Sequence, residues 1–212
     1  MFQIDQYQDQ LLRLHDHVCP RQVIGLRMGE LAGEILGLCL PQTDKRLLVF
    51  VETDGCFADG VMVATGSSLG HRTMRLQDNG KVAATFVDTR AEPCRAVRIW
   101  PHPLARQHAV EYVTAAQSRW HTQLAAYQIM PVDELLCACP VELAVPVRAI
   151  ISRPGVRATC AACGEEIINE REVVRAGMIL CRSCADAGEG RYYRQASDTH
   201  RSSTAIAEAE PA

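Results

Sequence analysis

The sequence predicts an α+β fold in which an antiparallel-rich sheet is flanked by helices and followed by a small zinc-binding domain. Three observations predict it. Strand-like apolar runs gather in the middle of the chain, helix-like stretches lie on either side of them, and two Cys-x-x-Cys pairs stand near the C-terminus. With 212 residues, of which 48% are hydrophobic and 22% charged, the chain can form one sizeable core and a small appendage.

The first part of the chain predicts two helices. A polar lead-in at residues 5–14 has weak helical character, and residues 20–36 form the clearest helical segment. Pro20 suits the first turn of that helix, and Gly37 can take the left-handed conformation that ends it. Its apolar residues fall three or four positions apart, namely Ile24, Met28, Leu31 and Ile35.

The middle of the chain predicts the sheet and its remaining helices. Strands are expected at residues 47–52, 81–88, 96–100 and 141–147, and helices at 57–65, 104–127 and 132–136. The segment 104–127 would be the longest helix, and Trp120 and Tyr127 lie on it at core spacing. Both aromatic residues are therefore predicted to pack in the core.

Composition predicts the domain boundaries. We expect a core domain at residues 1–152, a linker at 153–159 that is rich in arginine, proline and glycine, and a zinc finger at 160–194. The last segment, 195–212, consists largely of Ser, Thr, Ala and Glu, and it has too few large apolar residues to offset the entropy of ordering. It is predicted to be a disordered tail.

Four cysteines in the C-terminal region give the strongest chemical signal. Cys160 and Cys163 form one Cys-x-x-Cys pair, Cys181 and Cys184 form the other, and the spacing between the pairs is that of structural zinc sites. A hairpin with Ala176-Gly177 at its tip is expected between them. Four thiolates would saturate a zinc ion, which predicts a structural role. The alternatives are two redox dithiols or unrelated core cysteines.

Charge and hydropathy exclude several classes of function. The net charge of −3 gives no broad basic field, and the finger nearly balances its arginines against its carboxylates, which argues against a nucleic-acid partner. No apolar run approaches the roughly 20 residues needed to cross a bilayer, so no membrane association is expected. No secretory signal is visible at the N-terminus, so we expect a cytoplasmic protein whose ten cysteines bind metal or do chemistry.

A weaker signal lies in the core domain. His15, His17 and Cys19 alternate, so in an extended segment their side chains would project to one side, and Cys56 follows a predicted strand and turn. Together they could bind a second transition metal. Cys56 could instead be a reactive thiolate at a helix N-terminus, with His17 as its base. A third alternative is that the histidines are surface residues and the cysteines small buried apolar ones.

Several motifs in order along residues 10 to 190 resemble the FmdE family of formylmethanofuran dehydrogenase proteins. These are His15-x-His17-x-Cys19-Pro20, Glu52-x-x-Gly55-Cys56-x-x-Asp59, the loop from Gly66 to Gly70, and the run from Gly80 to Ala84. The resemblance implies an α+β core with a cleft lined by His and Cys residues, and an auxiliary C-terminal treble-clef zinc finger. It also implies a homodimer and a molybdenum or tungsten formylmethanofuran dehydrogenase system as partner.

Two positions depart from the pattern of that family. Asp16 replaces a glycine, and Ser67 replaces a common cysteine whose thiolate is absent here. The candidates that remain are His15, His17, Cys19, Cys56 and Asp59. The leading hypothesis is a metal-binding accessory protein. The alternatives are an enzyme or redox protein that depends on the Cys56 thiolate, and a zinc-finger adaptor whose core is only a scaffold.

Overall fold

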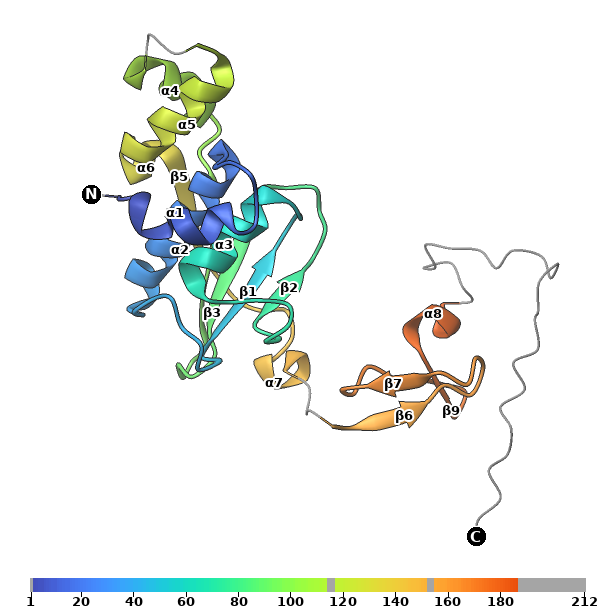
Figure 1. The fold of residues 1–212 in the computed structure, drawn as a ribbon. Helices are drawn as coiled ribbons and strands as arrows, with labels where there is room; N and C mark the ends of the chain where they lie inside the picture. The colour runs from blue at the N-terminus through green and yellow to red at the C-terminus, as the bar shows by residue number, and fades with distance from the viewer. Residues whose placement is uncertain (1, 114–116, 152–154, 187–212) are drawn as a thin grey trace, which may run out of the picture. The chain divides into compact units, whose positions relative to one another are not determined.

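The computed structural model describes residues 2–113, 117–151 and 155–186, and it divides into two compact units, Met1–Ala144 and Val145–Ala212 (Figure 1). Each unit is described by itself. The predicted tail at 195–212, the last residues of the predicted finger, and residues 153–154 of the predicted linker lie outside the described residues. None of the described helices combines the length and apolar character needed to span a membrane.

The first unit contains a mixed five-stranded sheet. Its order is β2-β1-β3-β4-β5, with β1 and β2 parallel and the other neighbours antiparallel. The strands are β1 (Leu47–Val51), β2 (Met74–Leu76), β3 (Ala84–Asp88), β4 (Arg95–Pro101) and β5 (Leu136–Val141). Together with the helices around it, this sheet confirms the predicted α+β class and its antiparallel-rich sheet.

Helices cover the sheet. They are α1 (Asp5–Leu12), α2 (Pro20–Leu36), α3 (Cys56–Thr65), α4 (Ala105–Tyr112), α5 (Arg119–Ile129) and α6 (Val132–Leu135). The central helix α2 packs against α3, α5 and strands β3 and β4, and Figure 1 shows α1, α2 and α3 gathered together. Most of α2 is buried, so its side chains join those of β1, β3 and β4 in the main core.

Both ends of α2 have the signals that the sequence predicts. Cys19 is the N-cap, and its backbone N–H donates to Oε1 of Gln22 over 2.8 Å. Pro20 occupies the first turn, where its missing N–H costs nothing. Gly37 ends the helix with a φ of 68°, the left-handed conformation that glycine adopts without strain. The helix consequently begins at the cysteine of the His-Cys motif.

Two expectations for the C-terminal half of this unit are wrong. The segment 104–127 is not one helix: α4 ends at Tyr112, and α5 begins after Ser118, whose Oγ accepts the N–H of His121 at 3.4 Å. A serine N-cap favours a fresh helix start over continuation. The longest described helix is therefore α2. The strand predicted at 141–147 lies earlier, at 136–141, where it pairs with β4 and leaves Cys139 exposed.

The second unit consists of small elements. They are α7 (Val147–Ile150), β6 (Arg157–Thr159), β7 (Glu166–Ile168), β8 (Val173–Arg175), β9 (Met178–Leu180) and α8 (Arg182–Ala185). Strands β6 and β7 form one hairpin, and β8 and β9 form the predicted second one, with Ala176 and Gly177 at positive φ at its tip. Among the described residues of this unit, the buried core consists of four side chains, namely Cys160, Ile167, Leu180 and Ala185.

Candidate metal centres and the cleft of the core domain

The four cysteines of the second unit converge on one point. Cys160 and Cys163 lie on the turn between β6 and β7, Cys181 is the N-cap of α8, and Cys184 lies within α8. Their sulfur atoms all lie within 4.8 Å of one another. Among the described residues, no other group of three or more His, Cys, Asp or Glu side chains gathers its ligand atoms in this way.

Backbone donors stabilise negative charge on this cluster. The N–H of Cys181 donates to Sγ of Cys160 at 3.3 Å, and the N–H of Cys184 donates to Sγ of Cys181 at 3.4 Å. These donors, first that of Cys181 and then that of Cys163, lower the pKa of Cys160 to about 6. Four converging sulfurs with amide donors fit a tetrahedral thiolate site for a structural metal such as zinc, which would have no open position for water.

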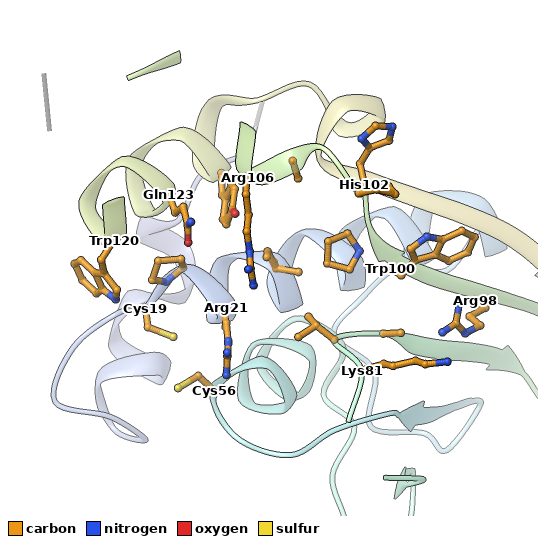
Figure 2. A pocket seen from close by; sticks show the side chains of 18 of the residues that line it. Cys19, Arg21, Cys56, Lys81, Arg98, Trp100, His102, Arg106, Trp120 and Gln123 are labelled. Carbon is orange, nitrogen blue, oxygen red and sulfur yellow. The ribbon is translucent and has the colours of Figure 1, made fainter. Parts of the chain in front are cut away.

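The first unit contains a cleft of about 790 Å³ (Figure 2). Its walls come from the starts of α2 and α3, from β4 with the segment that follows it, from residues 81–83, and from α4 and α5. Of the core residues singled out by sequence, His17, Cys19 and Cys56 line it. A volume of this size suits a small organic molecule or cofactor.

Cys19 and Cys56 meet in this cleft. Cys19 is only 7% exposed, and Cys56 is the first residue of α3 and half-buried. Burial, and to a smaller extent the hydrogen bond and charge of the Cys56 thiol, raise the pKa of Cys19. Figure 2 shows the two sulfur atoms in the same part of the cleft. Two helices therefore begin in the same part of the cleft, each with a cysteine that lines it.

The two histidines of the motif separate. The His17 imidazole lines the cleft, with its centroid 5.9 Å from that of Trp120. His15 does not line it: its Nε2 lies 2.6 Å from Oδ2 of Asp59 in a half-buried pair. The five candidates thus divide into a cleft set, His17, Cys19 and Cys56, and a separate pair, His15 and Asp59.

The two departures from the family pattern have small structural effects. Asp16 is not among the described residues with positive φ, so its backbone does not require glycine. Ser67 is 1% exposed, does not line the cleft, and its buried Oγ has no described hydrogen-bond partner. A cysteine there would not join the pair of Cys19 and Cys56.

Most of the residues that line the cleft were not predicted from the sequence as site residues. Four cationic residues line it, namely Arg21, Lys81, Arg98 and Arg106, and none of the described lining residues is acidic. Both tryptophans of the chain, Trp100 and Trp120, also line it. Trp120 is 39% exposed, so its predicted core position is wrong. Tyr127, by contrast, is buried as predicted.

The Arg98 guanidinium is neutralised by an acidic partner outside the wall. Its Nε and Nη2 donate to the two carboxylate oxygens of Glu52 at 2.6 and 2.9 Å. This bidentate pairing holds the pKa of Glu52 below its usual range. Arg21, Lys81 and Arg106 have no described carboxylate within 4.0 Å, so they give the cleft a net positive wall.

These features define a class of two-unit protein. One unit is an α+β core with a thiol-containing cleft, and the other is a finger with four cysteines that fit a structural metal. A family model described as "FmdE, Molybdenum formylmethanofuran dehydrogenase operon" matches residues 14–136. The chain belongs to this family, which confirms the resemblance of its motifs.

Two known proteins show how far the similarity extends. The crystal structure of a "tungsten formylmethanofuran dehydrogenase subunit e (fmde)-like protein" from Syntrophus aciditrophicus has the same fold, with a TM-score of 0.56 and 18% identity. The match covers 87% of this chain and 93% of that one. A "Probable S-adenosyl-L-methionine-binding protein" from Archaeoglobus fulgidus is 37% identical over 89 residues, or 41% of this chain. The aligned region spans only 24% of that relative.

Proposed function

We propose that this protein is a metal-binding accessory protein of a molybdenum or tungsten formylmethanofuran dehydrogenase system. The four cysteines of the finger hold a structural zinc ion, and the core cleft holds a second transition metal. We further propose that it acts in the cytoplasm as a homodimer. Membership of the FmdE family and the formylmethanofuran dehydrogenase name of the Syntrophus protein support the choice of system.

The position of the Cys19 and Cys56 thiols in the same part of the cleft is the observation that supports the second metal. Thiolates are soft ligands that favour Zn, Cu(I) and related ions, and here two of them come from different helices that start at the same place. His17 lines the same cleft and is the third donor that we propose. His15 is the wrong histidine for this role because it pairs with Asp59.

This core site differs from the finger in its capacity for chemistry. Two thiolates and one imidazole leave a coordination position open to a ligand from the cleft, whereas four thiolates leave none. The metal would supply Lewis-acid character at that position. The chain itself would supply the cavity, the two cysteines at the helix starts, and the cationic wall.

Cobalt binding tests the core site. Full-length protein with zinc in its finger is titrated with Co²⁺, and sulfur-to-cobalt charge-transfer absorption is recorded. We expect one further equivalent to bind with thiolate absorption, and this absorption to be lost in Cys19→Ser and in Cys56→Ser. Cys139→Ser is the matched control, because Cys139 is an exposed cysteine on β5 outside the cleft. Equal cobalt absorption in Cys56→Ser and Cys139→Ser would disprove the core site.

The position of Cys56 favours a second candidate function, that of a reactive or redox thiol. Cys56 is the first residue of α3, and His17, which would act as its base, lines the same cleft. This function requires rapid, site-selective alkylation of Cys56 in metal-free protein. If Cys56 reacts no faster than exposed Cys139, this second candidate is eliminated.

S-adenosylmethionine, which the name of the Archaeoglobus relative suggests, fits the cleft poorly. That cofactor has a net positive charge, because its sulfonium and ammonium groups outnumber its single carboxylate, and the described cleft wall has cationic residues and no acidic one. Most of the relative also lies beyond the aligned region. We therefore do not propose this cofactor.

A further inference from the structure

The charge of the cleft wall indicates what kind of molecule enters it. Three cationic side chains, Arg21, Lys81 and Arg106, have no described carboxylate within ion-pair distance. Like charges that share one wall repel each other and cost stability unless an anion joins them. A positively lined concave site also raises the local concentration of anions and their rate of arrival.

These cations come from three separate elements that face the same space. Arg21 lies in the first turn of α2, Arg106 lies on α4, and Lys81 precedes β3. Figure 2 shows the Arg106 side chain extending into the cleft from α4, Arg21 pointing toward the part that contains Cys56, and Lys81 at the other end near Arg98. Such an arrangement suits a ligand with more than one anionic group.

The aromatic residues of the wall indicate a second property of the ligand. Trp120 exposes 39% of its surface, a large apolar area to leave in water. Tyr127 lines the same cleft: burial raises the pKa of Tyr127, and the charge of the Arg106 guanidinium partly offsets that rise. An indole and cationic side chains that line one cleft suit a flat ring with acidic substituents, because the indole offers an apolar face and the cations pair with the acidic groups.

We propose that the cleft binds a planar aromatic molecule with carboxylate or phosphate groups. Arg21, Lys81 and Arg106 pair with the anionic groups, and the indole of Trp120 packs against the ring. The inference rests on the proposed function because it names the ligand class for the same cleft, next to the metal at Cys19 and Cys56. Arginine suits this role because its planar fork binds carboxylate and phosphate in a bidentate manner.

Intrinsic fluorescence tests the proposal directly, because the two tryptophans of the chain both line the cleft. Full-length protein is titrated with benzene-1,3-dicarboxylate and its neutral diamide, and separately with adenosine 5′-monophosphate and neutral adenosine. We expect at least one anion to give a saturable signal, about tenfold or more tighter than its neutral partner and weaker at higher salt. The two pairs distinguish a carboxylate site from a phosphate site.

Arg21→Glu is the decisive variant. Arg21 is exposed and lies in the first helical turn, where a glutamate is favourable for the helix, so the variant should fold. It should weaken anion binding at least tenfold. Arg13→Glu makes the same charge change at the exposed end of α1, outside the cleft lining, and should bind like wild type. If neither anion binds, if the neutral analogues bind equally well, or if Arg21→Glu matches Arg13→Glu, the proposal is overturned.

The Cys56→Ser variant separates this inference from the proposed function. Anion binding depends on the cations, so it should persist in that variant even when the core metal is lost. If the protein binds the anion but never takes up a core metal, the ligand class is supported and the core metal is refuted. If it takes up a core metal but binds no anion, the ligand class alone is refuted.

Discussion

The backbone of Gly60 lies directly against the carbonyl group of Gln22: a Cβ atom added to Gly60 would come within 2.2 Å of that oxygen. The reverse contact is equally tight, because a Cβ on Gly25 would lie 2.4 Å from the carbonyl oxygen of Phe57. Gly25 and Gly60 therefore let α2 and α3 cross at close range. Since Cys19 and Cys56 stand at the starts of these two helices, the crossing brings their thiols together.

Gly60→Ala should consequently weaken both the fold and the thiol pair. Overpacking against a backbone that cannot move aside costs about 1–3 kcal/mol. Urea unfolding measures the loss. Gly70→Ala is the control, because nothing lies within 4 Å of a Cβ there and its φ is not positive. Equal stability of the two variants would contradict the close-crossing account.

Glu52 stabilises one wall of the cleft. Its carboxylate accepts from Arg98 and, at 3.4 Å, from Nδ2 of Asn79, while its backbone oxygen accepts from the N–H groups of Asn79 and Lys81. Glu52→Gln should lower the free energy of unfolding by about 1–3 kcal/mol, because it removes a charge-assisted pair at a site only 7% exposed. Glu142→Gln, the same change at an exposed residue just after β5, should cost less. A loss below about 0.5 kcal/mol for Glu52→Gln would refute the assigned role.

The pair of Asp88 and Arg46 predicts how stability depends on pH. Hydrogen bonds from Arg46 to the buried Asp88 carboxylate, at 2.9 and 2.7 Å, hold the pKa of Asp88 below its ordinary value. The pKa of Asp88 is therefore lower in the folded protein than in the unfolded chain, where it is about 3.9. The ion pair stabilises the fold fully when the pH is above the unfolded-state pKa, and this stabilisation is lost as the pH falls through the folded-state pKa. The stability difference between wild type and Asp88→Asn should therefore stay constant from about pH 6 to 8 and shrink below about pH 4. A difference that grows in acid would contradict the ion pair.

The finger should depend on its metal for folding. The apolar core of its described part comprises four buried side chains, too few to offset the entropy of ordering without the metal. Cys163→Ser should lower the bound zinc by one equivalent and remove amide-exchange protection in β8 and β9. Protection in β3 and β4 of the first unit should persist. Unchanged protection in the finger of zinc-depleted protein would refute this dependence.

Short-range sequence signals correctly predicted the ends of α2 and the four-cysteine site with its hairpin. Helix α2 begins and ends where Pro20 and Gly37 predict, because the residues that set its ends lie at those ends. The double knuckle and its hairpin were likewise predictable, since cysteine spacing and a turn tip are short-range features. The family motifs added the cleft residues His17, Cys19 and Cys56.

The remaining features depend on contacts that spacing does not show. The alternation of His15 and His17 predicts that both side chains lie on one side of the chain. In the structure, the N–H of His15 donates to the carbonyl oxygen of Leu11 at 3.0 Å, so His15 belongs to the turn that ends α1. Its side chain pairs with Asp59 instead of lining the cleft. Trp120 faces the cleft because the chain starts a new helix after Ser118. The cationic wall combines four distant segments, which only the fold brings together.

Elemental analysis of the purified full-length protein is the sharpest test of a second metal in the core cleft. We expect two metal ions per chain in the wild type and in Cys139→Ser, and one, the zinc of the finger, in Cys19→Ser and Cys56→Ser. A single ion per wild-type chain, or two ions in Cys56→Ser, would contradict a metal centre at the paired thiols.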